Sequence, residues 1–166
     1  MSNPFDLSGK TALVTGGAQG LGRMIAEGLI GAGARVVITS RSAEKAAEAA
    51  KEISGKGMCI GLGADLSTPQ AAVDLAKEFR EVVGDELHVL VNNAGQSWGA
   101  NVDDFPDEAW GNVLAVNLQM PFTLVREFLP ELEKAGHADD PARILNIGSI
   151  AGATALRLRA YSYSSS

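Results

Sequence analysis

Five short runs rich in valine, isoleucine and leucine alternate along this chain with longer stretches of helical spacing. The runs cover residues 11–15, 35–39, 58–62, 88–91 and 143–147. They show little polar alternation, which is expected of strands covered on both faces. Strands that alternate with helices form βαβ units around a parallel sheet. The chain is therefore predicted to be an α/β protein with a doubly wound, Rossmann-like parallel sheet of at least five strands.

The four predicted helices lie between these runs. The first covers residues 21–30, and the second opens at the N-cap Ser42 and ends near Gly55. The third has Pro69 at its first helical position and stops at Gly84, and the fourth covers about residues 107–134. Because we find neither an internal repeat nor a linker, we expect residues 1–166 to form a single domain.

Composition excludes several classes of function. The net charge is −6 and no Lys/Arg cluster occurs, which argues against binding to nucleic acid or an anionic membrane. No apolar run is long enough to span a membrane, and the first residues lack the pattern of a signal peptide. The lone Cys59 favours a reducing compartment, so we expect a cytoplasmic protein, with Cys59 as core filler rather than a nucleophile. His88 and His137 are not accompanied by other residues at the spacing of metal ligands, so no metal site is predicted.

A glycine-rich loop, TGGAQGLG, connects the first strand to the first helix at residues 15–22. In this context Gly16 lets the chain turn off the strand, Gly20 lets backbone approach a pyrophosphate, and Gly22 permits close packing of helix on strand. The N–H groups at the start of the helix then face the negative charge. A plain turn is the alternative, but the context favours dinucleotide binding.

The spacing Thr-Gly-x-x-x-Gly-x-Gly resembles the glycine motif of the short-chain dehydrogenases/reductases. This resemblance implies a dinucleotide-binding domain over residues 1–166, with Gln19 and Leu21 also at the cofactor. Extended epimerases and dehydratases normally carry G-x-x-G-x-x-G, so that reading is disfavoured.

The end of the second strand selects the dinucleotide. An acid here would bind the ribose 2′-hydroxyl of NAD, but the sequence has Ser40 and Arg41. Arg41 can pair with a 2′-phosphate, which favours NADP(H), although a solvated helix-start residue is the alternative. The resemblance places Asp65 and Leu66, after the third strand, near the adenine.

Two further stretches resemble family signatures. LVNNAG, at residues 90–95, implies cofactor contacts from Asn92, Ala94 and Gly95, with satisfaction of turn backbone as the alternative. On the long helix, Asn117 lies on the apolar stripe, and Pro121 removes the donor for its carbonyl, which predicts a kink there. In the family an asparagine at this place holds a water of a proton relay.

The catalytic serine of the family corresponds to Ser149, and Tyr163 is the better match to the tyrosine of Tyr-x-x-x-Lys. Tyr161 would need a lysine at position 165, which is serine, whereas the lysine for Tyr163 would follow Ser166, where the chain ends. In such a site the tyrosine donates a proton, the serine orients the oxygen, and the lysine lowers the pKa of the phenol.

The family usually continues to about 250 residues, so this resemblance implies a fragment that is incomplete at its C-terminus, with its sheet truncated after the fifth strand, and inactive by itself. The stretches NNAGQSWGA and IGSIAG are most similar to NADPH-dependent 3-oxoacyl reductases, particularly the rhamnolipid-associated kind. The resemblance implies hydride transfer to or from a carbonyl or secondary alcohol, a 3-oxoacyl thioester as substrate, and a homo-oligomer when full-length. A non-catalytic NADP-binding sensor or pseudo-enzyme is the alternative.

Overall fold

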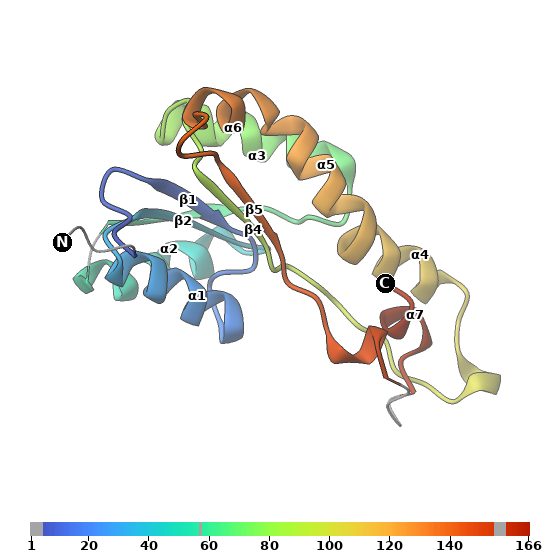
Figure 1. The fold of residues 1–166 in the computed structure, drawn as a ribbon. Helices are drawn as coiled ribbons and strands as arrows, with labels where there is room; N and C mark the ends of the chain where they lie inside the picture. Colours follow the sequence, from blue (N-terminus) through green and yellow to red (C-terminus); the bar gives the residue numbers. More distant parts are fainter. Residues whose placement is uncertain (1–4, 57, 155–158) are drawn as a thin grey trace.

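All five predicted runs form strands of one parallel sheet in the computed structural model, which describes residues 5–56, 58–154 and 159–166 (Figure 1). The order across the sheet is β3-β2-β1-β4-β5. This is the doubly wound arrangement that the alternation predicted. The strand order runs from β1 through β2 to β3 on one side, and it then reverses, so that β4 and β5 lie on the other side of β1. The strands are β1 Thr11–Val14, β2 Arg35–Ser40, β3 Cys59–Gly63, β4 Val89–Asn92 and β5 Arg143–Asn146.

The helices begin close to their predicted signals. The Ser42 hydroxyl accepts a hydrogen bond from the Lys45 N–H at 3.2 Å and caps α2, and Pro69 is the first residue of α3. Both starts confirm the local capping argument. The α-helices are α1 Gly20–Gly31, α2 Ala43–Ile53, α3 Pro69–Val82, α4 Glu108–Leu114, α5 Met120–Glu127, α6 Leu129–Ala135 and α7 Tyr161–Ser164.

Successive residues of each inner strand enter two different cores, because side chains alternate across a sheet. Leu13, Val37 and Leu90 pack in the core beneath α3, α5 and α6. Their neighbours, such as Val14 and Ile38, pack in the core beneath α1 and α2. Figure 1 shows these two groups of helices on opposite faces of the sheet.

The predicted long helix is divided into three α-helical segments. A π-helical turn, Ala115–Gln119, separates α4 from α5, and there the Met120 N–H bonds to the Ala115 carbonyl five residues earlier. Pro121 lies in the first turn of α5, so the predicted disturbance occurs just before the proline. A second break, at Phe128, precedes Pro130, and the prediction of one continuous helix is wrong there.

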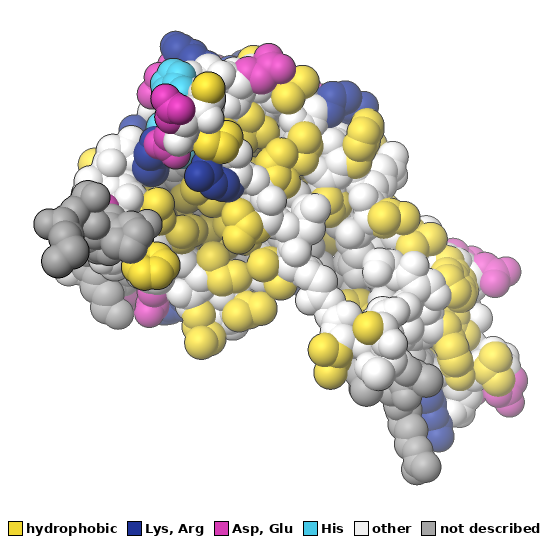
Figure 2. Space-filling view, in the orientation of Figure 1, with side chains coloured by type: hydrophobic (Ala, Val, Ile, Leu, Met, Phe, Trp, Pro, Cys, Tyr) yellow, Lys and Arg dark blue, Asp and Glu magenta, His cyan; other side chains and the backbone are white. Residues whose placement is uncertain are grey.

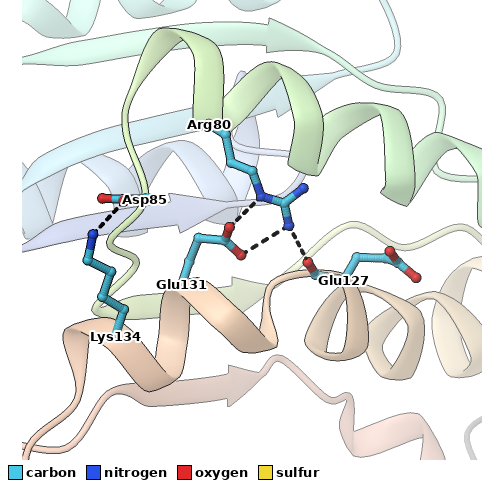
Figure 3. Close-up of polar contacts among 5 residues, drawn as sticks. All are labelled: Arg80, Asp85, Glu127, Glu131 and Lys134. Atoms are coloured by element: carbon cyan, nitrogen blue, oxygen red, sulfur yellow. Dashed lines mark hydrogen bonds and ion pairs between the residues drawn. The ribbon is translucent and has the colours of Figure 1, made fainter.

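Ion pairs join α3 to α5 and α6 on the outside of the first core (Figure 3). The Arg80 guanidinium binds the carboxylate of Glu131, whose side chain is 4% exposed, and also donates to the Glu127 carbonyl at 2.8 Å. Lys134 pairs with Asp85, but both of these side chains are more than half exposed. Since the Glu131 carboxylate is buried, its charge requires the compensation that Arg80 provides, whereas water can solvate the exposed Lys134 and Asp85.

Strand β5 departs from the expectation that every strand is covered on both faces. All four of its residues are exposed, and Ile144 and Leu145 are 45% and 44% accessible. Figure 2 shows hydrophobic side chains at the surface on the side of the molecule where β5 runs. Among the residues that the structure describes, β5 pairs with β4 alone, so it forms an open edge of the sheet.

Candidate functional site

The carboxyl edge of the sheet opens into two neighbouring cavities of about 850 and about 790 Å³. Ser149, Tyr163 and Asn117 border the first cavity, and the glycine loop and Arg41 border the second. Leu21 and the loop 93–96 line both. These residues, from six separate parts of the sequence, therefore surround one continuous cleft, at the position where open α/β sheets bind ligands.

The glycine loop has the geometry of a phosphate cradle. Gly16 and Gly20 have φ of +65° and +56°, the left-handed region that other residues avoid. A Cβ on Gly22 would lie 2.5 Å from the Gly16 carbonyl oxygen and 2.4 Å from the Asn93 side chain. Gln19 is the N-cap of α1 but makes no side-chain cap, so the first N–H groups of this helix remain available to an anion.

Thr15 and Asn93 hold this loop against the end of β4, and sequence reasoning assigned a role to neither. The Thr15 hydroxyl accepts from the N–H groups of Asn93 and Ala94 at 3.0 and 2.9 Å. The Asn93 side chain donates to the Thr15 carbonyl at 2.8 Å. The sequence did contain a signal that Asn92 and Asn93 have different surroundings. Side chains alternate along a strand, so two consecutive asparagines point to opposite sides.

Asn92 faces the other way, toward the first cavity. Its side chain is 5% exposed and donates to the Asn146 side chain on β5 at 2.8 Å. Its own Oδ1 has no hydrogen-bond partner within the residues that the structure describes. The structure thus places Asn92 in the wall between β4 and β5, while Ala94 and Gly95 line both cavities.

The mouth of the second cavity carries several charged groups. Arg41 and Lys45 line it on the side of α2, and Asp65 and Leu66 line it beyond β3. Glu44 is not part of this lining, but its carboxylate accepts from the hydroxyl of the lining residue Ser42 at 2.7 Å, which lowers the pKa of Glu44. The predicted cofactor residues after β2 and β3 therefore border the same space as the glycine loop.

Asn117 is a polar residue on an apolar stripe, and its side chain forms hydrogen bonds with the backbone of Gln96. Its side-chain oxygen accepts from the Gln96 N–H at 2.9 Å, and its amide nitrogen donates to the Gln96 carbonyl at 3.0 Å. Gln96 also donates from its side chain to the Asn112 carbonyl on α4. The loop after β4 is thereby fastened to the π-helical turn, a role that sequence reasoning did not assign to Gln96.

Ser149 and Tyr163 approach the cavity from β5 and α7. Ser149 caps a short 3₁₀ turn, Ile150–Gly152, by accepting the Ala151 N–H at 3.2 Å, and its hydroxyl proton is not used by that contact. Tyr163 is half-buried, and Ser166 joins its carbonyl to the Asn117 amide by hydrogen bonds of 2.9 and 3.0 Å.

Tyr161 does not line the cavity that Tyr163 borders. Its ring packs edge-on against Phe105, with centroids 5.2 Å apart, and it lines a separate pocket beside Trp110. Two residues along α7 rotate a side chain to a different face, which separates the two tyrosines.

Cys59 has no place in this cleft. It is half-buried on β3, and burial raises the pKa of its thiol to about 11, which fits core filler and not a nucleophile. Across residues 5–56, 58–154 and 159–166, no group of three or more His, Cys, Asp or Glu side chains is arranged to hold a metal ion. None of the helices in this part of the chain is both long and apolar enough to cross a membrane.

Comparison with known proteins gives close relatives. The chain is 45% identical over 159 residues to the rhamnolipids biosynthesis 3-oxoacyl-[acyl-carrier-protein] reductase of Pseudomonas aeruginosa, an alignment that covers 96% of this chain and 62% of that protein. It is 37% identical over 151 residues to 2-dehydro-3-deoxy-D-gluconate 5-dehydrogenase of Bacillus subtilis, covering 90% and 57%. The chain thus spans less than two thirds of the length of these relatives.

A solved structure matches over almost the whole chain. The Pseudomonas aeruginosa RhlG/NADP active-site complex has a TM-score of 0.95 and 44% sequence identity, and the match covers 99% of this chain and 64% of that one. The model of the family described as short chain dehydrogenase matches residues 10–166. Together with the glycine loop and the cleft at the carboxyl edge, these matches show that the chain belongs to the short-chain dehydrogenase family.

Proposed function

We propose that this chain is the cofactor-binding and proton-transfer part of an NADP(H)-dependent oxidoreductase, which moves hydride between nicotinamide and a carbonyl or secondary alcohol. The observation that carries the proposal is the continuous cleft: Asn117, Ser149 and Tyr163 border one end and the glycine loop borders the other. A hydride donor and a proton donor have to meet at one carbonyl group, and this cleft brings their candidate residues together.

The residues of the second cavity fit the cofactor. The uncapped start of α1 and the glycines at positive φ leave room and N–H donors for a pyrophosphate. Arg41 replaces the acid that an NAD-binding site carries, so it suits a phosphate ester. When bound, NADPH would supply the hydride. One similar solved structure is an NADP complex, which supports this choice of dinucleotide.

The residues of the first cavity would handle the proton. The Ser149 hydroxyl accepts from the Ala151 N–H, so its own proton is free to be donated to a carbonyl oxygen. Tyr163 would donate the proton that completes the alcohol. Asn117 and Gln96 hold the neighbouring loop in place through their paired hydrogen bonds. The family's lysine belongs at the position that follows Ser166.

For the substrate we propose a 3-oxoacyl thioester. The support is the 45% identity to a 3-oxoacyl-[acyl-carrier-protein] reductase. A polar secondary alcohol is the second candidate, because the Bacillus subtilis relative is a gluconate dehydrogenase by name. A non-catalytic sensor is less well supported, since all three proposed catalytic side chains border the cleft.

The proposal is tested by reading the coding sequence beyond the codon for Ser166 and assaying the encoded product. We expect NADPH to be oxidised in the presence of a 3-oxoacyl thioester. Tyr163→Phe should lower kcat by about a thousandfold, because general acid catalysis contributes about 10²–10⁴. Tyr161→Phe, which removes the same atom outside the cleft, should leave kcat unchanged. Equal rates for the two variants would refute the assignment of the proton donor.

A further inference from the structure

Lys45 is a cation at the cofactor cleft, and neither the sequence motifs nor the family resemblance assigned a role to it. It lies in the first turn of α2 and lines the same cavity as Arg41 and the glycine loop. Both side chains are exposed, and neither has an ion-pair partner within the residues that the structure describes. Two uncommitted positive charges therefore border the end of the cleft that follows β2.

The acid of the same turn, Glu44, is hydrogen-bonded to Ser42, which itself lines the cavity. Glu44 lies between the two cations in the sequence, yet its carboxylate is held by the Ser42 hydroxyl at 2.7 Å and does not line the cavity. Because the Ser42 proton is used in this contact, that hydroxyl cannot donate to a phosphate unless it releases Glu44. The nearest acid in the lining is Asp65, across the cavity beyond β3.

A phosphate monoester carries about −1.5 to −2 charge at neutral pH, so a single guanidinium neutralises only part of it. A second cation at the same cavity can supply the remainder. The basic residues elsewhere on α2 do not meet this requirement, since Lys51 is in the last turn and is not part of the lining.

We infer that Lys45 acts with Arg41 as a second specificity residue for the 2′-phosphate of NADP(H). This inference rests on the proposed cofactor and deepens it. The two cations have different tasks: the planar guanidinium of Arg41 gives directed hydrogen bonds, whereas the ammonium of Lys45 acts as a point charge. The Lys45 contribution is consequently smaller and more sensitive to salt.

The test is equilibrium binding to the full product of the coding sequence, measured by titration with NADPH, NADH and adenosine 2′,5′-bisphosphate. Arg41→Ala should weaken NADPH binding about ten- to hundredfold, as expected for a lost charge-assisted hydrogen bond. Lys45→Ala should weaken it about three- to fivefold. Both variants should bind the bisphosphate more weakly, and neither should change the affinity for NADH.

Two further variants control for charge alone. Lys45→Arg keeps the cation and should retain NADPH affinity. Lys51→Ala removes an equal charge from the far end of α2 and should leave NADPH affinity unchanged.

In wild type the affinity for NADPH should fall more steeply with salt than in Lys45→Ala. An unchanged NADPH affinity in Lys45→Ala, or equal losses for NADPH and NADH, would overturn the inference while the Arg41 result still supports the proposed cofactor. Wild type that binds neither dinucleotide would instead overturn the proposed function, and the inference with it.

Discussion

Strands β1 and β5 belong to the same sheet and have similar aliphatic content, but their surroundings are opposite. In β1 the residues Ala12, Leu13 and Val14 are fully buried between two layers of helices. In β5 all four residues are exposed, although its register with β4 is regular. Aliphatic content therefore predicts a strand, whereas its burial depends on which helices lie over it. Four matched pairs of substitutions contrast packed and open positions of this kind.

The largest expected effect is at the two leucines of these strands. Leu13→Ala should lower the free energy of unfolding by about 3 kcal/mol, because it leaves a cavity in a close-packed core. Leu145→Ala should lower it by less than about 1 kcal/mol, since that side chain is already 44% exposed. Urea titration of both variants measures the contrast. Similar losses would mean that β5 is covered in solution.

Next in size is a pair of glycines on α1. Gly22→Ala should destabilise the chain by about 1–3 kcal/mol and weaken dinucleotide binding, because the new Cβ meets the Gly16 carbonyl oxygen at 2.5 Å. Gly28→Ala has open space and should stabilise the helix by about 0.5–1 kcal/mol. Thermal melting gives both signs, and a stabilising Gly22→Ala would contradict the described loop geometry.

The ion pairs of Figure 3 provide a smaller contrast. Arg80→Ala should cost about 1–2 kcal/mol, because it leaves the buried Glu131 carboxylate without its cation while water can still reach the half-exposed arginine site. Lys134→Ala removes a partner from an exposed pair and should not change the midpoint of unfolding measurably. If Lys134→Ala is the more damaging variant, burial does not decide the value of these pairs.

The smallest effect concerns pH and the two histidines. The His88 Nδ1 accepts the Thr11 N–H at 3.1 Å, and burial, followed by the Lys10 charge, lowers the pKa of His88 below its ordinary value. Since the folded state resists protonation, stability is complete above the unfolded pKa of about 6.5 and declines as pH falls through the lower folded pKa. Melting points from pH 8 to 5 should show this decline.

His88→Asn should flatten that decline, because the titrating group is gone. His137→Asn should leave it intact, since His137 is exposed at the loop before β5 and its backbone, not its ring, bonds to Asp140. If the decline disappears with His137→Asn instead, His137 and not His88 is the source of the pH response.

The comparison also shows where sequence reasoning succeeded. Ser42, Pro69 and the positive-φ glycines Gly16 and Gly20 act within a few residues of themselves, so their roles follow from local backbone requirements. The parallel, doubly wound sheet followed from the alternation of strands and helices, because parallel strands need crossover connections and these are right-handed. The family resemblance favoured Tyr163 over Tyr161, and in the structure Tyr163 and Ser149 line the same cavity whereas Tyr161 lines another.

That reasoning could not predict contacts between segments that lie far apart in the sequence. The sequence by itself determined the βαβ order and the glycine loop, because each depends on spacing along one segment, and the resemblance to a family supplied the candidate catalytic residues. Only the tertiary structure decided that Asn93 and Thr15 lock the loop to β4, that Asn117 holds Gln96, and that Lys45 joins Arg41 at the cleft. The physical reason is that hydrogen bonding and charge compensation depend on proximity in space, which the packing of helices on the sheet sets and no local pattern encodes.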